Sequence, residues 1–225
     1  SLVKRILMTT VYSLSDYGLR TYVKEWINDN RPASPTDNND VDNYLCKRVK
    51  EAVSETVKGA RDGMKYIKSI ATILTDNNKV FEVTLPNGFH MISSYKQSLS
   101  RRVKTKTQGT LYYTSYTIDG EKLLKKKAVN AATANYIHAL DASILYDVVE
   151  NVPKSLPFSL VHDSLYYRAG DVDVFYEQVR KSVTHIFSEN LLEELKRQVE
   201  AQTGLKLPDV PALGSIDLDE IENAA

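Results

Sequence analysis

The chain has 225 residues, of which 42% are hydrophobic, and its 29 basic and 29 acidic side chains give a formal net charge of zero. This length and composition argue against a disordered chain and allow one large or two small domains with a sizeable core. The single cysteine excludes an intramolecular disulfide and a cysteine-based zinc cage, and no apolar run approaches the roughly 18 residues of a membrane span. We therefore expect a soluble intracellular protein with no membrane partner.

The first third of the chain is predicted to be helical. Apolar residues recur at helical spacing over residues 2–11, and the same periodicity predicts a second helix over 17–28. The polar segment 28–43, which contains two prolines, is predicted to be a linker. Helical periodicity resumes over 44–75, where two glycines interrupt it, so one or two helices are expected there.

The rest of the chain is predicted to combine hairpins with helices. Asn87-Gly88 lies between two β-prone runs and is a typical hairpin turn. Gln108-Gly109 separates two further β-prone runs in the same way. The predicted hairpins span 80–93, 101–117 and 158–168, and the predicted helices span 131–149 and, as a pair, 172–203.

Charge is distributed unevenly although its sum is zero. Residues 96–127 carry nine basic and two acidic side chains, a net charge of +7. Residues from 180 onward carry five basic and nine acidic side chains, a net charge of −4. The neutral sum therefore conceals a basic ribbon, and local potential rather than net charge should govern binding.

The sharpest local feature is the run from Phe158 to Arg168, in which His162-Asp163-Ser164 interrupts two β-prone segments. Such a hairpin places a carboxylate at its tip, where strands fix it better than a loop would. Mg²⁺ prefers oxygen ligands and takes one or two carboxylates, so Asp163 is a candidate metal ligand. The alternative is an ordinary turn, in which Asp and Ser are common.

Two helical faces carry further candidates. Lys4, Met8 and Tyr12 recur at intervals of four, so the lysine could face a triphosphate while the ring contacts a sugar or base. An amphipathic helix with a solvated lysine and a buried tyrosine is the alternative. His138, with Asp141 one turn further, is either functional or a structural pair on a half-buried helix.

Taken together and in order, these segments resemble the single-subunit RNA polymerases of bacteriophages and mitochondria. Val161-His162-Asp163-Ser164 looks like the third catalytic motif of that family. The resemblance is collinear over nearly the whole chain. The other similar segments are residues 3–13 with Tyr17-Gly18-Leu19-Arg20, which resemble the fingers helix, the run 135–143, and the shorter matches at 84–88, 95–96 and 208–218.

The resemblance implies a role for each matching residue of the two helices. Lys4, beside Arg5, would neutralise the phosphates of the incoming nucleotide. Met8 would pack near the base-pairing pocket. Tyr12, with His138, would select ribose over deoxyribose.

The resemblance also implies the chemistry and the partners. Asp163 would be one of two carboxylates that hold a pair of Mg²⁺ ions, with His162 near the primer terminus. Metals about 4 Å apart would assist attack of the RNA 3′-hydroxyl on the α-phosphate of a nucleoside triphosphate. The partners would be the DNA template, the promoter and the nascent RNA. The basic ribbon would be the promoter-specificity hairpin, which enters a major groove or contacts only phosphates through Arg101, Arg102, Lys104 and Lys106.

Three departures from the family pattern shape the expectation. The family's arginine before Ser1 and its other metal-binding aspartate are not among these residues, Ser13 replaces a usual glycine, and an aromatic tail is missing after Ala225. We therefore expect a C-terminal fragment, or the smaller subunit of a split polymerase, that is inactive without the upstream part. It would act in the host cytoplasm if phage-encoded and in the mitochondrial matrix if organellar.

The expected fold is α+β, the C-terminal fingers and palm of a right-hand polymerase. Fingers are expected over 1–138, with the specificity hairpin at about 96–118, and palm over 139–225. Two other functions are open at this point. One is a DNA polymerase of the bacterial repair type, against which Ser164 argues because that family has glutamate after His-Asp. The other is a non-catalytic remnant of the fold that binds nucleic acid.

Overall fold

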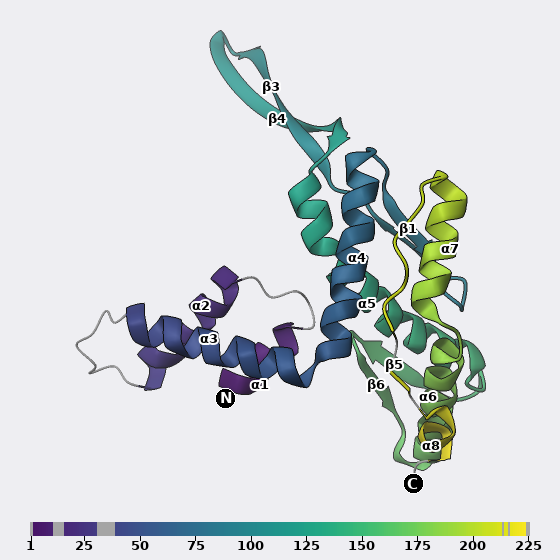
Figure 1. Ribbon diagram of the computed structural model, residues 1–225. Coiled ribbons are helices and arrows are strands. Elements are labelled where there is room, and N and C mark those ends of the chain that lie inside the picture. Colours follow the sequence, from purple (N-terminus) through teal and green to yellow (C-terminus); the bar gives the residue numbers. More distant parts are fainter. Residues whose placement is uncertain (1, 11–15, 31–38, 213, 216, 224–225) are drawn as a thin grey trace.

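The computed structural model describes residues 2–10, 16–30, 39–212, 214–215 and 217–223 (Figure 1). Within these ranges the chain is α+β, with helices joined by three separate two-stranded antiparallel hairpins. No helix in the described part is both long and apolar enough to cross a membrane. The elements are α1 (Leu2–Thr10), α2 (Asp16–Asn30), α3 (Asn39–Thr56), α4 (Lys58–Asp76), β1 (Phe81–Thr84), β2 (His90–Ser93), β3 (Lys96–Thr107), β4 (Thr110–Leu123), α5 (Lys125–Asn151), β5 (Phe158–Val161), β6 (Ser164–Tyr167), a 3₁₀ turn (Ala169–Asp171), α6 (Val172–Phe187), α7 (Leu191–Thr203) and α8 (Leu218–Asn223).

The largest core lies between α4, α5, α7 and the β1–β2 hairpin. On α4, Ile67, Ile70 and Leu74 recur at intervals of three and four, so they form one buried stripe. Tyr136 of α5 is buried in the same core, and its hydroxyl donates to the carbonyl of Leu191 at 3.1 Å. The buried hydroxyl is therefore satisfied, and α5 is held firmly against α4 and α7.

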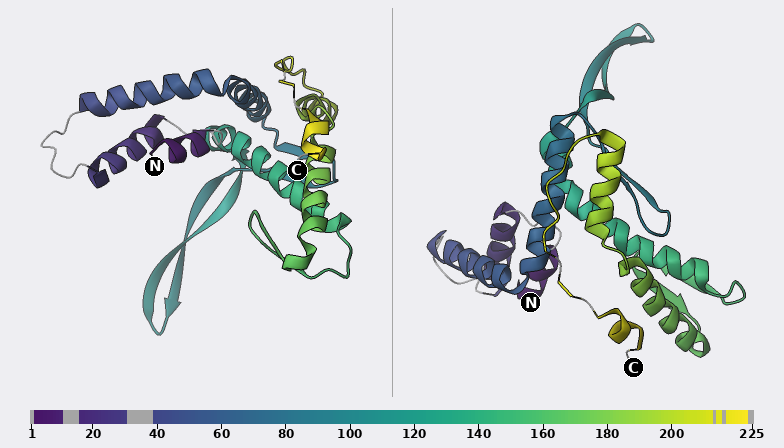
Figure 2. Two further views of the ribbon diagram at one scale, coloured as in Figure 1. Left: turned by 90° about the horizontal axis from the view of Figure 1, so that it is seen from below. Right: turned by 45° about the vertical axis from the view of Figure 1, so that its right-hand side comes forward.

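Two smaller clusters hold the remaining elements. Ile6 and Val23 belong to a cluster shared by α1, α2 and α3, which form a lobe to one side of the molecule (Figures 1 and 2). Val148 and Phe175 belong to a cluster between α5 and α6, and the β5–β6 hairpin packs on it. There, the ring of Tyr167 stacks on Phe175 with the centroids 4.5 Å apart.

The linker predicted over 28–43 is wrong at both ends. α2 continues to Asn30 and α3 begins at Asn39, so helical residues occupy part of the predicted linker. Asp42 lies in the first turn of α3, where negative charge favours a helix N-terminus, and it pairs with Lys24 of α2 at 3.8 Å. The break between α3 and α4 lies at Val57, which has φ −114° and ψ 51°.

The predicted hairpins and helices are confirmed in type, but two of them are longer than predicted. The second hairpin spans 96–123, longer than the ribbon predicted at 101–117 and longer at its second end than the specificity hairpin expected at about 96–118. α5 begins at Lys125 rather than at residue 131. The first turn of α5 consists of exposed lysines, which conceal the helical pattern. Ala128 and Ala132 are buried and continue the stripe of Tyr136 toward the N-terminus at intervals of four.

Candidate active site and basic hairpin

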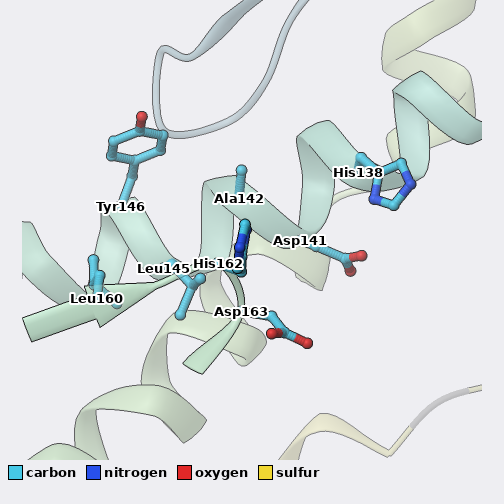
Figure 3. Close-up of a pocket in the computed structure, with 8 residues that line it drawn as sticks. All are labelled: His138, Asp141, Ala142, Leu145, Tyr146, Leu160, His162 and Asp163. Atoms are coloured by element: carbon cyan, nitrogen blue, oxygen red, sulfur yellow. The ribbon is translucent and has the colours of Figure 1, made fainter. Parts of the chain in front are cut away.

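A pocket of about 550 Å³ opens between α5 and the β5–β6 hairpin (Figure 3). It brings together four residues that the sequence analysis singled out: His138, Asp141, His162 and Asp163. Both walls are held by buried contacts, since α5 is anchored in the main core and the hairpin packs on the α5–α6 cluster. The lining residues are His138, Asp141, Ala142, Leu145 and Tyr146 of α5, and Leu160, His162 and Asp163 of the hairpin.

The turn of the hairpin gives Asp163 its position. Val161 pairs with Ser164, so the turn contains only His162 and Asp163. His162 has a φ of 56°, a left-handed conformation that costs a non-glycine residue about 1–3 kcal/mol. Glycine would adopt this conformation freely, so a histidine at this position costs conformational energy that glycine would not.

Two carboxylates, Asp141 and Asp163, line the same pocket from different elements (Figure 3). Burial raises the pKa of Asp141, the nearby His138 lowers it, and the charge of Asp163 raises it. The two carboxylates repel each other when both are ionised, and a bound cation would relieve that repulsion. In the described ranges, no three His, Cys, Asp or Glu side chains gather into a metal-binding group. Asp163 can thus supply part of a ligand shell but not all of it.

The candidates on α1 are not among the residues that line this pocket. Arg5 joins α1 to α2, because its Nη1 donates to Glu25 Oε2 at 2.9 Å and its guanidinium lies 4.1 Å from the centroid of the Tyr22 ring. The substrate role predicted for Arg5 would therefore require it to leave this partner. Of the other candidates here, Lys4 and Met8 are exposed, while Tyr12 and Ser13 lie outside the described residues.

The apolar end of the pocket is formed by residues for which the sequence analysis predicted no role. Ala142 and Tyr146 follow His138 at intervals of four and lie on the same face of α5. That spacing is the sequence signal that points to them. The ring of Tyr146 also stacks on Phe89 of the β1–β2 hairpin, with centroids 5.6 Å apart and an interplanar angle of 21°.

The β3–β4 hairpin projects from the body of the molecule (Figure 1). The pairing register shows that its two faces carry different side chains. Residues paired directly across antiparallel strands lie on the same face, and faces alternate along each strand. The guanidinium of Arg102 agrees with this register, since it lies 4.5 Å from the centroid of the Tyr113 ring. Of the four basic residues predicted to contact DNA, three therefore lie on one face of the hairpin and one on the other. One face carries Arg102, Lys104 and Lys106 with Leu111 and Tyr113, and the other carries Arg101 and Val103 with Tyr112 and Tyr116.

The root of this hairpin is fixed to α5 one turn before His138. Asn135 Nδ2 donates to Ser93 Oγ at 2.8 Å and to Tyr95 Oη at 3.1 Å. The backbone N–H of Leu124 donates to the carbonyl of Tyr95 at 2.8 Å. The hairpin and the pocket are therefore connected through one stretch of α5.

Comparison with known proteins gives a consistent result. The family model described as DNA-dependent RNA polymerase matches residues 1–207. A mitochondrial DNA-directed RNA polymerase 1 of Nicotiana sylvestris is 26% identical over 224 residues, which are 98% of this chain and 22% of the relative. A chloroplastic/mitochondrial DNA-directed RNA polymerase 2 of Arabidopsis thaliana is 28% identical over 96% of this chain and 21% of the relative. The DNA-directed RNA polymerase of Pseudomonas phage phiKMV is 25% identical over all of this chain and 27% of the relative. The chain thus spans about a fifth to a quarter of the length of these relatives.

Proposed function

Because this chain belongs to the family of DNA-dependent RNA polymerases, we propose that it takes part in template-directed synthesis of RNA from nucleoside triphosphates. The pocket that joins Asp163 and His162 with His138 is the observation that supports this most directly. In the proposed reaction the RNA 3′-oxygen forms a bond to the α-phosphorus, and the bond to the leaving pyrophosphate breaks. The family match argues against a DNA polymerase of the bacterial repair type.

We propose Asp163 as one ligand of Mg²⁺. An exposed carboxylate at a two-residue turn, with Asp141 in the same pocket, is a donor set that suits this hard cation. When bound, Mg²⁺ would neutralise phosphate charge and favour the deprotonated hydroxyl. Its other ligands would be water, substrate phosphates and a carboxylate from the upstream part of the polymerase.

On α1, the exposed ammonium of Lys4 would neutralise the triphosphate, and Met8 would pack beside the nascent base pair. Arg5 would reach a phosphate only by exchanging its bond to Glu25, so its present contacts support a role in holding α1 against α2. Tyr12 and His138 would select ribose.

The β3–β4 hairpin would contact the DNA template and its promoter. Three basic side chains on one face of a two-stranded ribbon support this proposal, because such a ribbon fits a major groove and can reach phosphates on either side of it.

The finer architecture is also a proposal: fingers over residues 1–138 and palm over 139–225. α5 runs unbroken from Lys125 to Asn151 and would connect the two. The relatives are named as mitochondrial, chloroplastic or phage polymerases. We propose a phage-infected cytoplasm or the mitochondrial matrix as the setting.

Asp163→Asn in the complete polymerase tests the proposed function. Asparagine keeps the size of the side chain but removes the charge that would bind the cation. Extension of an RNA primer on a DNA template with ribonucleotides and Mg²⁺ should fall by about 100-fold or more. The matched control is Asp173→Asn on an exposed turn of α6, which should extend like the wild type. The wild type is assayed in parallel with deoxyribonucleotides.

Each outcome of this experiment has a definite meaning. Unchanged extension by Asp163→Asn would remove Asp163 from the reaction centre. A wild type that prefers deoxyribonucleotides would contradict RNA synthesis. A wild type that binds the RNA primer paired to its DNA template without extending the primer would identify a non-catalytic remnant.

A further inference from the structure

The pocket has two chemically different ends (Figure 3). One end carries the ionisable side chains of His138, Asp141, His162 and Asp163, the other carries Leu145, Tyr146 and Leu160, and Ala142 lies between them. We propose that the apolar end, with Tyr146 as its wall, binds the nucleic-acid strand whose reacting terminus lies at Asp163. In this arrangement the strand runs along α5 from His138 toward Tyr146. The inference rests on the proposed function and adds a second binding surface to it.

Tyr146 is exposed yet held in place, which is the property of a binding platform. It is 56% exposed, and its ring stacks on Phe89, which packs against the main core. The turn that carries Phe89 is itself tied to α5. There, Asn87 Nδ2 donates to the Ser143 carbonyl at 2.9 Å, and Asn87 Oδ1 accepts from the Phe89 N–H at 3.1 Å. A ring already ordered by these contacts loses little conformational entropy when a ligand packs against it.

The shape of the pocket favours a strand over a single nucleotide. His138 and Tyr146 are eight residues apart on one helix, which corresponds to about 12 Å along its axis. Stacked nucleotides advance about 3.4 Å each, so this distance covers about three to four of them. A strand presents its terminal hydroxyl to the ionisable end, while its sugars and base edges lie against Leu145 and Tyr146. Ala142, between the two ends, leaves room for close approach.

The length of the paired primer provides the test. In the complete polymerase, RNA primers paired to the template over about two, about four and about eight nucleotides are extended by one nucleotide. The measured quantity is the scaffold concentration that gives half-maximal extension. Tyr146→Ala should raise it about fivefold or more for the longest hybrid, because losing about 40 Å² of apolar contact with the strand costs about 1 kcal/mol. It should leave the value for the shortest hybrid unchanged. Tyr146→Phe, which keeps the ring, should behave like the wild type.

Two further variants separate binding from damage to the fold. Tyr44→Ala is the matched control, since Tyr44 lies on α3 with a similar exposure of 58%, and it should leave every hybrid length unaffected. Phe89→Leu keeps an apolar side chain but removes the stacked ring that supports Tyr146. It should therefore also raise the concentration for half-maximal extension of the longest hybrid.

The inference is overturned if Tyr146→Ala leaves all three hybrids unchanged. It is also overturned if the variant raises the concentration for half-maximal extension equally for all three hybrids. The shortest hybrid does not reach Tyr146, so an equal effect could not come from a contact with that ring. A wild type that extends no primer would instead contradict the proposed function. The two failures are therefore distinguishable.

Discussion

The His162–Asp163 turn combines a strained backbone with the proposed metal ligand, so one substitution separates stability from activity. His162→Gly should relieve the left-handed conformation at φ 56° and slow amide hydrogen exchange in the β5–β6 hairpin about fivefold, the equivalent of about 1 kcal/mol. Primer extension should fall, because the ring near the proposed primer terminus is lost. Hydrogen exchange and primer extension are both measured on the complete polymerase.

A second strained turn supplies the control. Gln108 has a φ of 50° in the β3–β4 turn, and Gln108→Gly should relieve strain there without changing extension of a preassembled primer. Faster exchange of the β5–β6 hairpin in His162→Gly would contradict the prediction, because it would show that the histidine side chain stabilises the turn.

Single residues differ in how far the sequence alone could identify them. Asp163 and His162 could be predicted because they are neighbours in one short motif between β-prone runs. For Tyr146 the spacing from His138 indicates the face of the helix, but the stacking that orders its ring could not be predicted, because Phe89 is distant in the sequence and reaches it only in the folded chain. The hydrogen bond of Arg5 to Glu25 could not be predicted either, because it joins two helices that meet only in the folded chain.

Among the elements, the two-faced β3–β4 hairpin permits an internally controlled prediction. Lys104→Ala combined with Lys106→Ala removes two charges from one face and should weaken binding of duplex DNA by the complete polymerase. The slope of log affinity against log salt should decrease by up to about 2, since each phosphate contact contributes about 0.9. Arg101→Ala, on the opposite face, should change affinity and slope much less. Equal effects of Arg101 and of the lysines, charge for charge, would contradict a single DNA-binding face.

The types of the elements could be predicted more reliably than their ends. The Asn87-Gly88 and Gln108-Gly109 turns are confirmed, and their glycines adopt φ values of 82° and 80°, which glycine accepts without strain. The end of β4 at Leu123 was missed, because both strands of this hairpin are largely exposed and no buried face produces an alternating pattern. The start of α5 was missed because lysines fill its first turn.

At the scale of the whole molecule, α5 connects the parts that the proposed function requires. It contributes Tyr136 to the main core, Asn135 to the root of the β3–β4 hairpin, His138 to the pocket and Val148 to the cluster beneath the β5–β6 hairpin. α1, α2 and α3 share a separate cluster and lead into α4 at Val57. The catalytic residues proposed on α1 are thus carried by a different cluster from those in the pocket.

This division predicts unequal stability across the molecule. Among the described residues, four are buried in the cluster of α1, α2 and α3, against 17 in the main core. Amides of α2 and α3 should therefore exchange faster than those of α4 and α5 in the complete polymerase, because less apolar burial opposes local opening. Adding an RNA–DNA scaffold with the next nucleotide should slow exchange in α1, and Lys4→Ala should reduce that protection. Equal exchange in the two regions without ligand would contradict the division, and nucleotide-dependent protection that persists in Lys4→Ala would separate Lys4 from the phosphates.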